Sequence, residues 1–350
     1  MQKTFIFPSV FEENYREYEK IANDFLDAMK IKNFNGKDYI IGEMALKEGS
    51  SPHKFLNSSA EDLDYRLLGL IGLLIATQGT YSKLIVTTGF PFTTYQPYKQ
   101  GAIDFFKGSH EITFDSRTLG GDNLEKVRFS VADVDVMTEV DGSIKAIRDG
   151  EIKEKDNFFI ASLGYGTFEL ALSAPSGLIF RTTHSSKGLI YAVSTLENEL
   201  QKKYYLNLLT EQQIERAFQR GRMMINRKNT DLREMRGKAL KSYYSEVVSP
   251  AMRKKFSDED FYRAQKIYLV GGGAMYEEIV ESFKEEFEDV LDVVVLPEPN
   301  LTASRGYCLR SVELAKQKIS TLDDRGSYAC VGLDLGNNNT VITVDNEFDS

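Results

Sequence analysis

Three glycine-rich turns in this chain of 350 residues could together hold a phosphate group, because each follows an apolar segment. Phosphate oxygens need several backbone N–H donors at close range. Glycine allows that approach because it has no Cβ atom and accepts positive φ. One such turn alone is weak evidence, since glycine in a tight turn is mostly structural. The turns are Leu333-Asp334-Leu335-Gly336-Asn337-Asn338-Asn339-Thr340, Leu163-Gly164-Tyr165-Gly166-Thr167 and Gly271-Gly272-Gly273-Ala274-Met275.

The residues around these turns indicate which phosphate chemistry is available. Asp334 adds a carboxylate for Mg²⁺, which usually keeps several waters and takes one or two carboxylates. The third turn precedes an expected helix, whose N-terminus adds N–H groups and a positive dipole end. The chain has no GxxxxGK[ST] sequence, and its GGGAMY sequence lacks the GxGxxG spacing, so a P-loop NTPase and a dinucleotide-binding fold are both disfavoured.

Composition sets broad limits on the function. The length is enough for two domains, and 42% hydrophobic with 27% charged residues is ordinary for a soluble globular protein. The net charge of −9 argues against a general nucleic-acid coat. Two cysteines, Cys308 and Cys330, give no disulfide framework and no metal-binding spacing, so we expect a cytoplasmic protein. We expect no signal peptide, and the most apolar run, residues 67–76, is too short for a transmembrane segment.

Strands that alternate with helices predict an α/β protein. Apolar residues at helical spacing predict helices over 11–31 and 61–78. The stretch 186–265 reads as mostly helical, and it contains a basic segment, 216–241, that fits either a solvated helix face or a contact with an acidic partner. Two more helices are expected over 275–287 and 303–319. Strands are expected over 4–7, 39–46, 83–92, 110–114, 127–136, 158–164, 168–174, 177–183, 266–270, 292–299 and in a terminal hairpin over 329–344.

The ordered set of motifs resembles the actin-like ATPases, in particular the archaeal and plasmid-segregation (ParM-type) actins, over nearly the whole chain. Residues 329–350 placed before Met1 read like the opening of those proteins, with a phosphate hairpin, a polar turn and an F-P-S strand. The segments YIIGEMA, KLIVTTGFP, SLGYGTFE, IYLVGGGA and LPEPNLTASRGY then follow in family order. The resemblance therefore implies a circularly permuted chain, and we expect Met1 and Ser350 to lie near each other on adjacent strands.

The resemblance implies an actin-like, ribonuclease H-like fold with two domains and a nucleotide cleft between them. Domain I would comprise residues 1–155 and 303–350, with a small subdomain at about 11–56. Domain II would comprise residues 156–302, with a helical subdomain at about 201–257.

The resemblance also implies ATP or ADP and Mg²⁺ as ligands. Asp334 would hold Mg²⁺ through water, and Glu139, at a strand-to-helix turn, would orient the attacking water, with Asp133, Asp135 and Asp141 as rivals. The expected nucleotide-binding residues are Gly336, Asn337, Asn338, Asn339, Thr340, Gly164, Tyr165, Gly166, Thr167, Gly271, Gly272, Gly273, Ala274 and Met275.

The chain departs from the family pattern at three positions. In the second hairpin, Ser162 replaces the first Asp of the family pattern and Glu169 replaces the last. After the first hairpin, where the family often has a basic residue, this chain has Thr340-Val341-Ile342. These changes remove one carboxylate and one cation from the phosphate site, while the backbone donors remain. Lys187 or an arginine of 216–236 could supply a cation.

Two functions from different classes are compatible with these residues. The first is a cytoskeletal ATPase that assembles with itself into a filament, because nucleotide binding between two domains can change the end surfaces of the subunit. The second is a soluble phosphotransferase that uses the same cradle; an adaptor-like protein without turnover is a third. A further adaptor protein is a possible partner, and no specific nucleic acid is expected.

Overall fold

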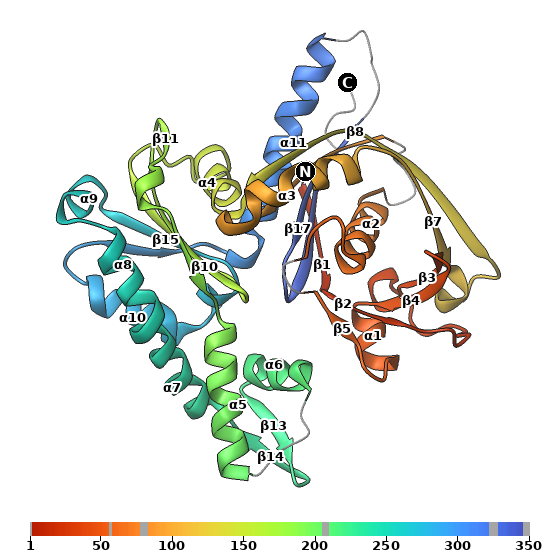
Figure 1. Ribbon diagram of the computed structural model, residues 1–350, viewed down its shortest axis with the longest axis horizontal. Helices are drawn as coiled ribbons and strands as arrows, with labels where there is room; N and C mark the ends of the chain where they lie inside the picture. Colours follow the sequence, from red (N-terminus) through yellow and green to blue (C-terminus); the bar gives the residue numbers. More distant parts are fainter. Residues whose placement is uncertain (1, 56–57, 78–82, 205–209, 322–327, 346–350) are drawn as a thin grey trace. The chain divides into compact units, whose positions relative to one another are not determined.

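The computed structural model describes residues 2–55, 58–77, 83–204, 210–321 and 328–345. The chain forms two units, each with its own sheet and its own hydrophobic core (Figure 1). Unit 1 comprises Met1–Glu154 and Leu301–Ser350, and unit 2 comprises Lys155–Asn300. In the described residues, no helix is long and apolar enough to cross a membrane.

Unit 1 is built on a sheet of ten strands in the order β1-β18-β17-β6-β8-β7-β3-β4-β2-β5. Strands β17, β6 and β8 run parallel to one another, and the other pairs are antiparallel. The strands are β1 (Gln2–Pro8), β2 (Val10–Glu13), β3 (Lys30–Phe34), β4 (Lys37–Ile41), β5 (His53–Lys54), β6 (Lys83–Phe90), β7 (Gly108–Asp115), β8 (Leu124–Thr138), β17 (Ala329–Leu335) and β18 (Asn339–Asp345). The helices are α1 (Glu43–Glu48), α2 (Leu63–Thr77), α3 (Phe92–Phe106), α4 (Glu139–Asp149) and α11 (Thr302–Thr321).

The two faces of β17 are covered by different helices (Figure 1). Leu333 and Leu335 belong to the core that includes the apolar residues of α2. Cys330 packs with Ala315 of α11. Because successive side chains of a strand point to opposite faces, Asp334 shares the α11 face with Cys330.

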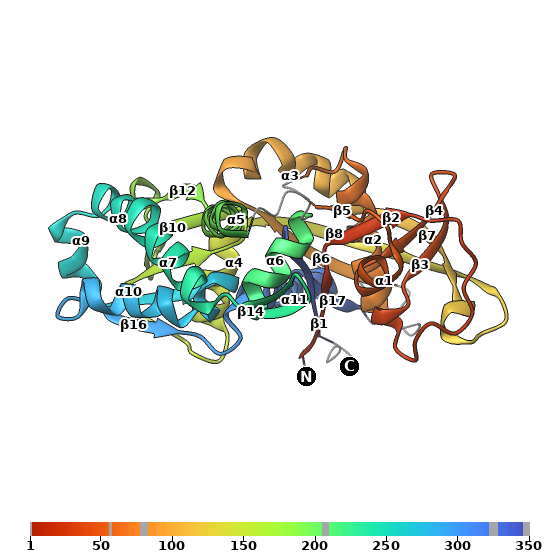
Figure 2. The same cartoon turned by 90° about the horizontal axis from the view of Figure 1, so that it is seen from below.

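Strand β1 pairs with β18 along its whole described length, with Gln2 opposite Asp345 and Pro8 opposite Asn339. The two views show β1 and β17 running together in this part of the sheet (Figures 1 and 2). Strands β17, β18 and β1 therefore form an antiparallel group of three, in which β17 and β18 are the C-terminal hairpin and β1 is the third strand. Met1 and Ser350, whose proximity we expect from the sequence, lie outside the described residues.

Helix α11 packs on β17, β6 and α4, and at two glycines the main chains come into direct contact. A Cβ atom at Gly306 would lie 1.7 Å from the carbonyl oxygen of Gly142 in α4. A Cβ atom at Gly332 in β17 would lie 2.0 Å from the carbonyl oxygen of Ser304. The hydroxyl of Ser311 donates to the carbonyl of Val331 at 2.8 Å, so buried polar groups in this contact are paired.

Unit 2 is built on a smaller sheet in the order β11-β10-β9-β15-β16, with β12 also paired to β10. A separate β13–β14 hairpin lies beyond α6, at the end of α5 that is remote from β10 (Figure 1). The strands are β9 (Phe158–Leu163), β10 (Thr167–Ala174), β11 (Gly177–Leu178), β12 (His184–Lys187), β13 (Arg222–Ile225), β14 (Lys228–Asp231), β15 (Lys266–Val270) and β16 (Asp292–Val295). The helices are α5 (Ile190–Tyr204), α6 (Glu211–Arg220), α7 (Arg233–Tyr243), α8 (Ser249–Lys255), α9 (Asp258–Arg263) and α10 (Glu277–Phe287).

The two sheets share one spatial pattern. In each, a central strand is followed on one side by two strands that are each antiparallel to the one before, and on the other side by two parallel strands. Unit 1 has β1-β18-β17-β6-β8, and unit 2 has β11-β10-β9-β15-β16. The order along the chain differs: unit 2 begins with its hairpin, β9–β10, whereas in unit 1 the hairpin β17–β18 comes after the other three strands.

The prediction of a helix over 11–31 is wrong. Strand β2, a 3-10 helix at Phe25–Asp27 and the start of β3 occupy this stretch. Its backbone N–H groups donate to distant carbonyls: Asn14 to Asp38 at 2.9 Å and Ile21 to Thr118 at 2.7 Å. Because an α-helix needs these groups for its own bonds, tertiary pairing has replaced the helix that the apolar spacing indicates.

Three other expectations need correction. The strand expected over 39–46 ends at Ile41, and α1 begins after Gly42, whose φ is +62°. The strand expected over 177–183 is only two residues long, because the Thr182 hydroxyl accepts the Leu172 N–H at 2.9 Å and a 3-10 helix follows. The helical stretch 186–265 is interrupted by the β13–β14 hairpin, whose turn has positive φ at Asn226 and Arg227. Helix α3 falls where we expected no element.

The α11 contact can be tested with two glycine substitutions in helices of unit 1. Gly306→Ala should lower the free energy of unfolding by about 2–3 kcal/mol or more, because its methyl group would overlap the Gly142 backbone. Gly101→Ala in α3 is the matched control, since its Cβ would lie 3.7 Å from the nearest atom; it should raise stability by up to about 1 kcal/mol. Urea unfolding measures both, and equal stability of the two variants would contradict this close contact.

Candidate functional site

The first glycine hairpin joins β17 to β18 in unit 1. Its turn is closed by the Gly336 N–H, which donates to the Asn339 carbonyl at 3.2 Å. A Cβ atom at Gly336 would lie 2.9 Å from that carbonyl oxygen, so a side chain there would disturb the turn. Thr340 is fully buried, and its hydroxyl lies 3.0 Å from that of Ser9, just after β1. The hairpin is therefore fixed on both of its strands.

The second glycine hairpin, between β9 and β10 of unit 2, has the same local geometry. The Gly164 N–H donates to the Thr167 carbonyl at 2.9 Å, and a Cβ at Gly164 would lie 2.8 Å from that oxygen. Gly164 thus corresponds to Gly336, and Thr167 to Asn339. By the same spacing, Ser162 corresponds to Asp334. Each unit therefore presents one hairpin of the same type, but only the unit 1 hairpin carries a carboxylate at this position.

Carbonyl groups of both hairpin turns accept hydrogen bonds from the segment that follows a neighbouring strand, which is β1 in unit 1 and β12 in unit 2. The Ser9 N–H donates to the Asn338 carbonyl, and the corresponding Gly188 N–H donates to the Gly166 carbonyl, both at 3.0 Å. In unit 2, Leu189 and Ile190 also donate to the carbonyls of residues 164 and 165. Carbonyl oxygens would repel a phosphate, so this arrangement suits an anion that binds to the N–H groups of the turns.

The third glycine turn lies next to the second hairpin in unit 2. Strands β15 and β9 are parallel, with Val270 opposite Ser162, so both turns follow the same edge of the sheet. Gly271 has a φ of +82°, and a Cβ there would lie 2.8 Å from the Leu163 carbonyl oxygen. Gly273 approaches the Leu163 side chain equally closely, whereas a Cβ at Gly272 would meet open space. Two of the three glycines are therefore required by packing, and the middle one is not.

Asp334 is the carboxylate of the unit 1 hairpin. It lies on the α11 face of the sheet, beside the last β17 residue that pairs with β6, Leu333. Burial raises the pKa of its carboxyl to about 7. Ionisation of this carboxyl in its buried position costs free energy, and a bound cation would offset that cost.

Glu139 is the first residue of α4, directly after β8, and the Thr138 hydroxyl caps the helix by accepting the Asp141 N–H at 3.0 Å. Because β17, β6 and β8 are parallel, Asp334 and Glu139 lie at the same edge of the unit 1 sheet. The rival carboxylates are engaged elsewhere: Asp135 accepts from Arg310 at 2.6 Å, Asp133 from Lys107 at 3.3 Å and Asp141 from Thr138 at 2.8 Å. Of the four carboxylates, Glu139 is the one directly after Thr138, the last β8 residue that pairs with β6.

The structure thus gathers the expected residues in two groups. Asp334, residues 336–340 and Glu139 share one edge in unit 1, and residues 164–167 and 271–275 share one edge in unit 2. Met275 is 66% exposed, and the adjacent Tyr276 packs under the Arg236 guanidinium, whose carbon lies 5.3 Å from the ring centre.

Two cations lie close to these turns. The sequence identifies Arg236 only as one member of a basic stretch, and nothing local in the sequence shows its contact with Tyr276. Lys187 is opposite Thr167 on β12, beside the second hairpin.

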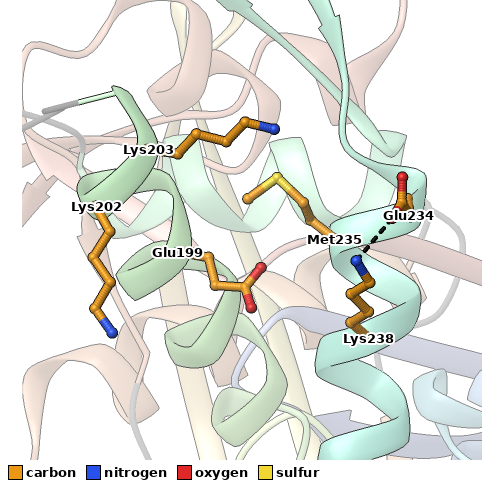
Figure 3. Close-up of a pocket in the computed structure, with 6 residues that line it drawn as sticks. All are labelled: Glu199, Lys202, Lys203, Glu234, Met235 and Lys238. Carbon is orange, nitrogen blue, oxygen red and sulfur yellow. Dashed lines mark hydrogen bonds and ion pairs between the residues drawn. The ribbon is translucent and has the colours of Figure 1, made fainter.

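No cluster of three or more His, Cys, Asp or Glu residues that could hold a metal occurs in the described part of the chain. The carboxylate set fits Mg²⁺ that is also bound by water and phosphate, which needs only one or two carboxylates. A separate hollow of about 360 Å³ lies between α5 and α7 (Figure 3). Glu199 and Met235 point into this hollow. Its lining combines positive lysines with negative glutamates and includes no residue of the glycine turns.

The different constraints on the glycines of the third turn give a stability test. Gly271→Ala should lower the free energy of unfolding by about 1–3 kcal/mol, because its φ is positive and the new methyl group would meet Leu163. Gly272→Ala should change it by less than about 0.5 kcal/mol, since no atom lies within 4 Å of its Cβ position. Thermal unfolding of both variants is the measurement, and a Gly272 variant as unstable as the Gly271 variant would show that this turn is built differently.

Comparisons with known proteins agree with this architecture. Residues 2–142 match the family model described as the N-terminal domain of actin-like proteins. No curated protein matches the sequence. An archaeal actin homologue, Ta0583, has a similar solved structure, with a TM-score of 0.69, 16% identity and coverage of 89% of this chain and 93% of that one.

Two further solved structures are similar to the same degree. The ParM of a 15-stranded filament from Clostridium botulinum gives a TM-score of 0.67 at 17% identity, covering 89% of this chain and 92% of that one. The actin-like protein Alp7A gives 0.66 at 16% identity, covering 90% and 93%. These matches span nearly the full length of each protein, and together with the family match they identify the fold of this chain as actin-like.

Proposed function

We propose that this chain is an actin-like protein that binds and hydrolyses ATP and assembles with itself into filaments. The observation that carries the proposal is the pair of matching glycine hairpins, one in each unit, whose carbonyls are occupied by neighbouring N–H groups. Such a pair suits a ligand with several phosphates. Similar structures support the nucleotide: the archaeal actin homologue has been solved in complex with ADP, and a Bacillus thuringiensis ParM with ATP.

The residues divide into binding and chemical groups. The backbone of Gly336–Thr340 and of residues 164–167 would bind the phosphates, and residues 271–275 the ribose and α-phosphate side. Asp334 would hold Mg²⁺ through water, and the ion supplies charge neutralisation to the phosphates. Glu139 would orient and deprotonate the attacking water, because it stands at the edge of the sheet that also carries Asp334. This division assigns hydrolysis to unit 1 and most of the binding contacts to unit 2.

Self-assembly is supported by what is known of similar structures, since the Clostridium botulinum ParM was solved as a filament. We take the two units as the domains, with subdomains at about 11–56 and 201–257 as the surfaces of assembly. Cys308 and Cys330 are buried free thiols, which suits a reducing cytoplasm. An adaptor protein that links the filament to a cargo would complete the system.

We further propose that the chain is a circular permutation of the actin-like order. The support is internal: unit 2 runs hairpin, third strand, parallel strands, whereas unit 1 runs third strand, parallel strands, hairpin, in the same spatial pattern. Gln2 is paired with Asp345, so a short turn from β18 to β1 would restore in unit 1 the order of unit 2.

A relinked chain tests the permutation. Joining Asp345 to Gln2 by a short turn and opening the chain between Thr321 and Tyr328 should give a folded protein that binds ATP as the original does, because every strand pairing is kept. The same joining with the opening placed between Thr138 and Glu139 is the control, and it should lose stability. Circular dichroism and ATP titration measure both. An unfolded first variant would count against the permuted order.

Sedimentation with and without ATP, combined with phosphate release, tests the function itself. The wild type should pellet with ATP and release phosphate. Glu139→Gln should still bind ATP and pellet, but release phosphate roughly 10²–10⁴ times more slowly, because the base is lost. Asp334→Ala should abolish Mg²⁺-dependent release.

Three results would contradict these assignments. Unchanged release by the Asp334 variant would refute the metal-side site, and unchanged release by the Glu139 variant would refute the base. A protein that never pellets and turns over only when a small acceptor is added would instead be a phosphotransferase.

A further inference from the structure

Helix α6 contacts both glycine turns of unit 2. At its first residue, Glu211 accepts a hydrogen bond at 3.3 Å from the hydroxyl of Tyr165, which is in the second hairpin. Near its other end, the Phe218 ring meets the Tyr276 ring edge-to-face, with centres 5.4 Å apart. Tyr276 follows the third turn directly. A ten-residue helix therefore spans the two turns that we assign to the nucleotide.

Tyr165 is well placed to transmit a change in the hairpin. Its carbonyl accepts the Ile190 N–H at 2.9 Å, and its ring packs against the core of unit 2. Its hydroxyl faces Glu211 and also Glu215, which is only 6% exposed. Burial, followed by these two carboxylates, raises the pKa of the Tyr165 hydroxyl. The hydroxyl therefore stays protonated at neutral pH and acts as the donor to α6.

Helix α6 leads directly into the basic β13–β14 hairpin. The Leu232 N–H returns to the Gly221 carbonyl at 2.8 Å, which ties the base of this hairpin to the end of α6. Arg222, Arg227 and Lys228 are exposed, and within the described residues none of the three forms an ion pair. A movement of α6 would thus displace a surface of positive charge in a protein of net charge −9.

We propose that Tyr165 is a positioning residue that couples occupancy of the second glycine hairpin to the position of α6 and of the basic β13–β14 hairpin. The proposal rests on the nucleotide-binding function proposed above. A ligand that holds the tip of the hairpin restrains the Tyr165 backbone and, through the hydroxyl, the start of α6. Coupling of this kind is reciprocal, so a partner that fixes the basic hairpin would also tighten nucleotide binding.

Hydrogen exchange measured by mass spectrometry tests this coupling with Mg²⁺ and ATP as the probe. In the wild type, ATP should slow exchange in peptides that cover 160–169 and also in peptides that cover 211–231. In Tyr165→Phe, ATP should still protect 160–169, whereas the added protection of 211–231 should fall by about tenfold, the scale of one hydrogen bond to a charged group. Equal protection of 211–231 in both proteins would overturn the proposal.

Further variants separate the coupling from general effects of losing a hydroxyl. Tyr15→Phe removes a similar bond in unit 1, where the hydroxyl donates to Glu13 at 2.8 Å, and it should leave the exchange of 211–231 unchanged. Glu211→Ala should give part of the Tyr165→Phe effect, because the hydroxyl also faces Glu215 of α6, and adding Glu211→Ala to Tyr165→Phe should cause no further loss. Additive losses in the double variant would contradict action through this bond.

Failure of the nucleotide function would be recognised separately. In that case ATP would not protect 160–169 even in the wild type. Exchange of the wild type and of Tyr165→Phe, compared without nucleotide, then tests whether Tyr165 holds α6. Tyr165→Phe should speed exchange of the α6 peptide by about tenfold relative to the wild type, because the helix loses a charge-assisted bond at its start. Unchanged exchange in the absence of ATP would show that Tyr165 does not hold α6.

Discussion

Contact between the backbone atoms of α11, α4 and β17 is the constraint on which the unit 1 site depends. A Cβ at Gly306 would lie 1.7 Å from the Gly142 carbonyl oxygen, and one at Gly332 would lie 2.0 Å from that of Ser304. At these two points the main chains meet with no space for a side chain, while the Tyr307 ring of α11 packs against Gly89 of β6 and Gly142 of α4. Asp334 lies two residues after Gly332, and Glu139 three residues before Gly142. One contact therefore positions both candidate acidic groups.

The two glycine hairpins show how a shared fold can carry unequal chemistry. Their turn bonds and close approaches correspond, and in each turn one carbonyl accepts a matching N–H, from Ser9 in unit 1 and from Gly188 in unit 2. Backbone geometry depends little on the side chains, so both hairpins keep the same turn although their sequences differ. The side chain before the turn differs, with Asp334 in unit 1 and Ser162 in unit 2. A carboxylate is thus present at this position in the hairpin of unit 1 and absent from it in the hairpin of unit 2.

The elements around the glycine turns were predictable from the sequence because their signals are local. Apolar runs followed by Gly336, Gly164 or Gly271 predict a strand and a turn, and the structure has both in each case. The stretch 11–31 was not predictable, because its N–H groups pair with residues as distant as Thr118. The contacts of α6 with Tyr165 and Tyr276 also join residues far apart in sequence, so spacing could not reveal them.

The charges near the second hairpin give Tyr165 a further physical role. Glu211 and Glu215 are carboxylates close to a turn that is assigned to phosphates, and like charges at short range are unfavourable in a partly buried place. The Tyr165 hydroxyl donates a hydrogen bond to Glu211 and so lies between this carboxylate and the turn. If a phosphate binds at the turn, the Tyr165–Glu211 hydrogen bond would keep α6 at a fixed distance from it. The repulsion between the phosphate and the carboxylates of α6 would then be smaller than at closer range. A tyrosine can therefore hold α6 in place and also keep its negative charge away from the ligand.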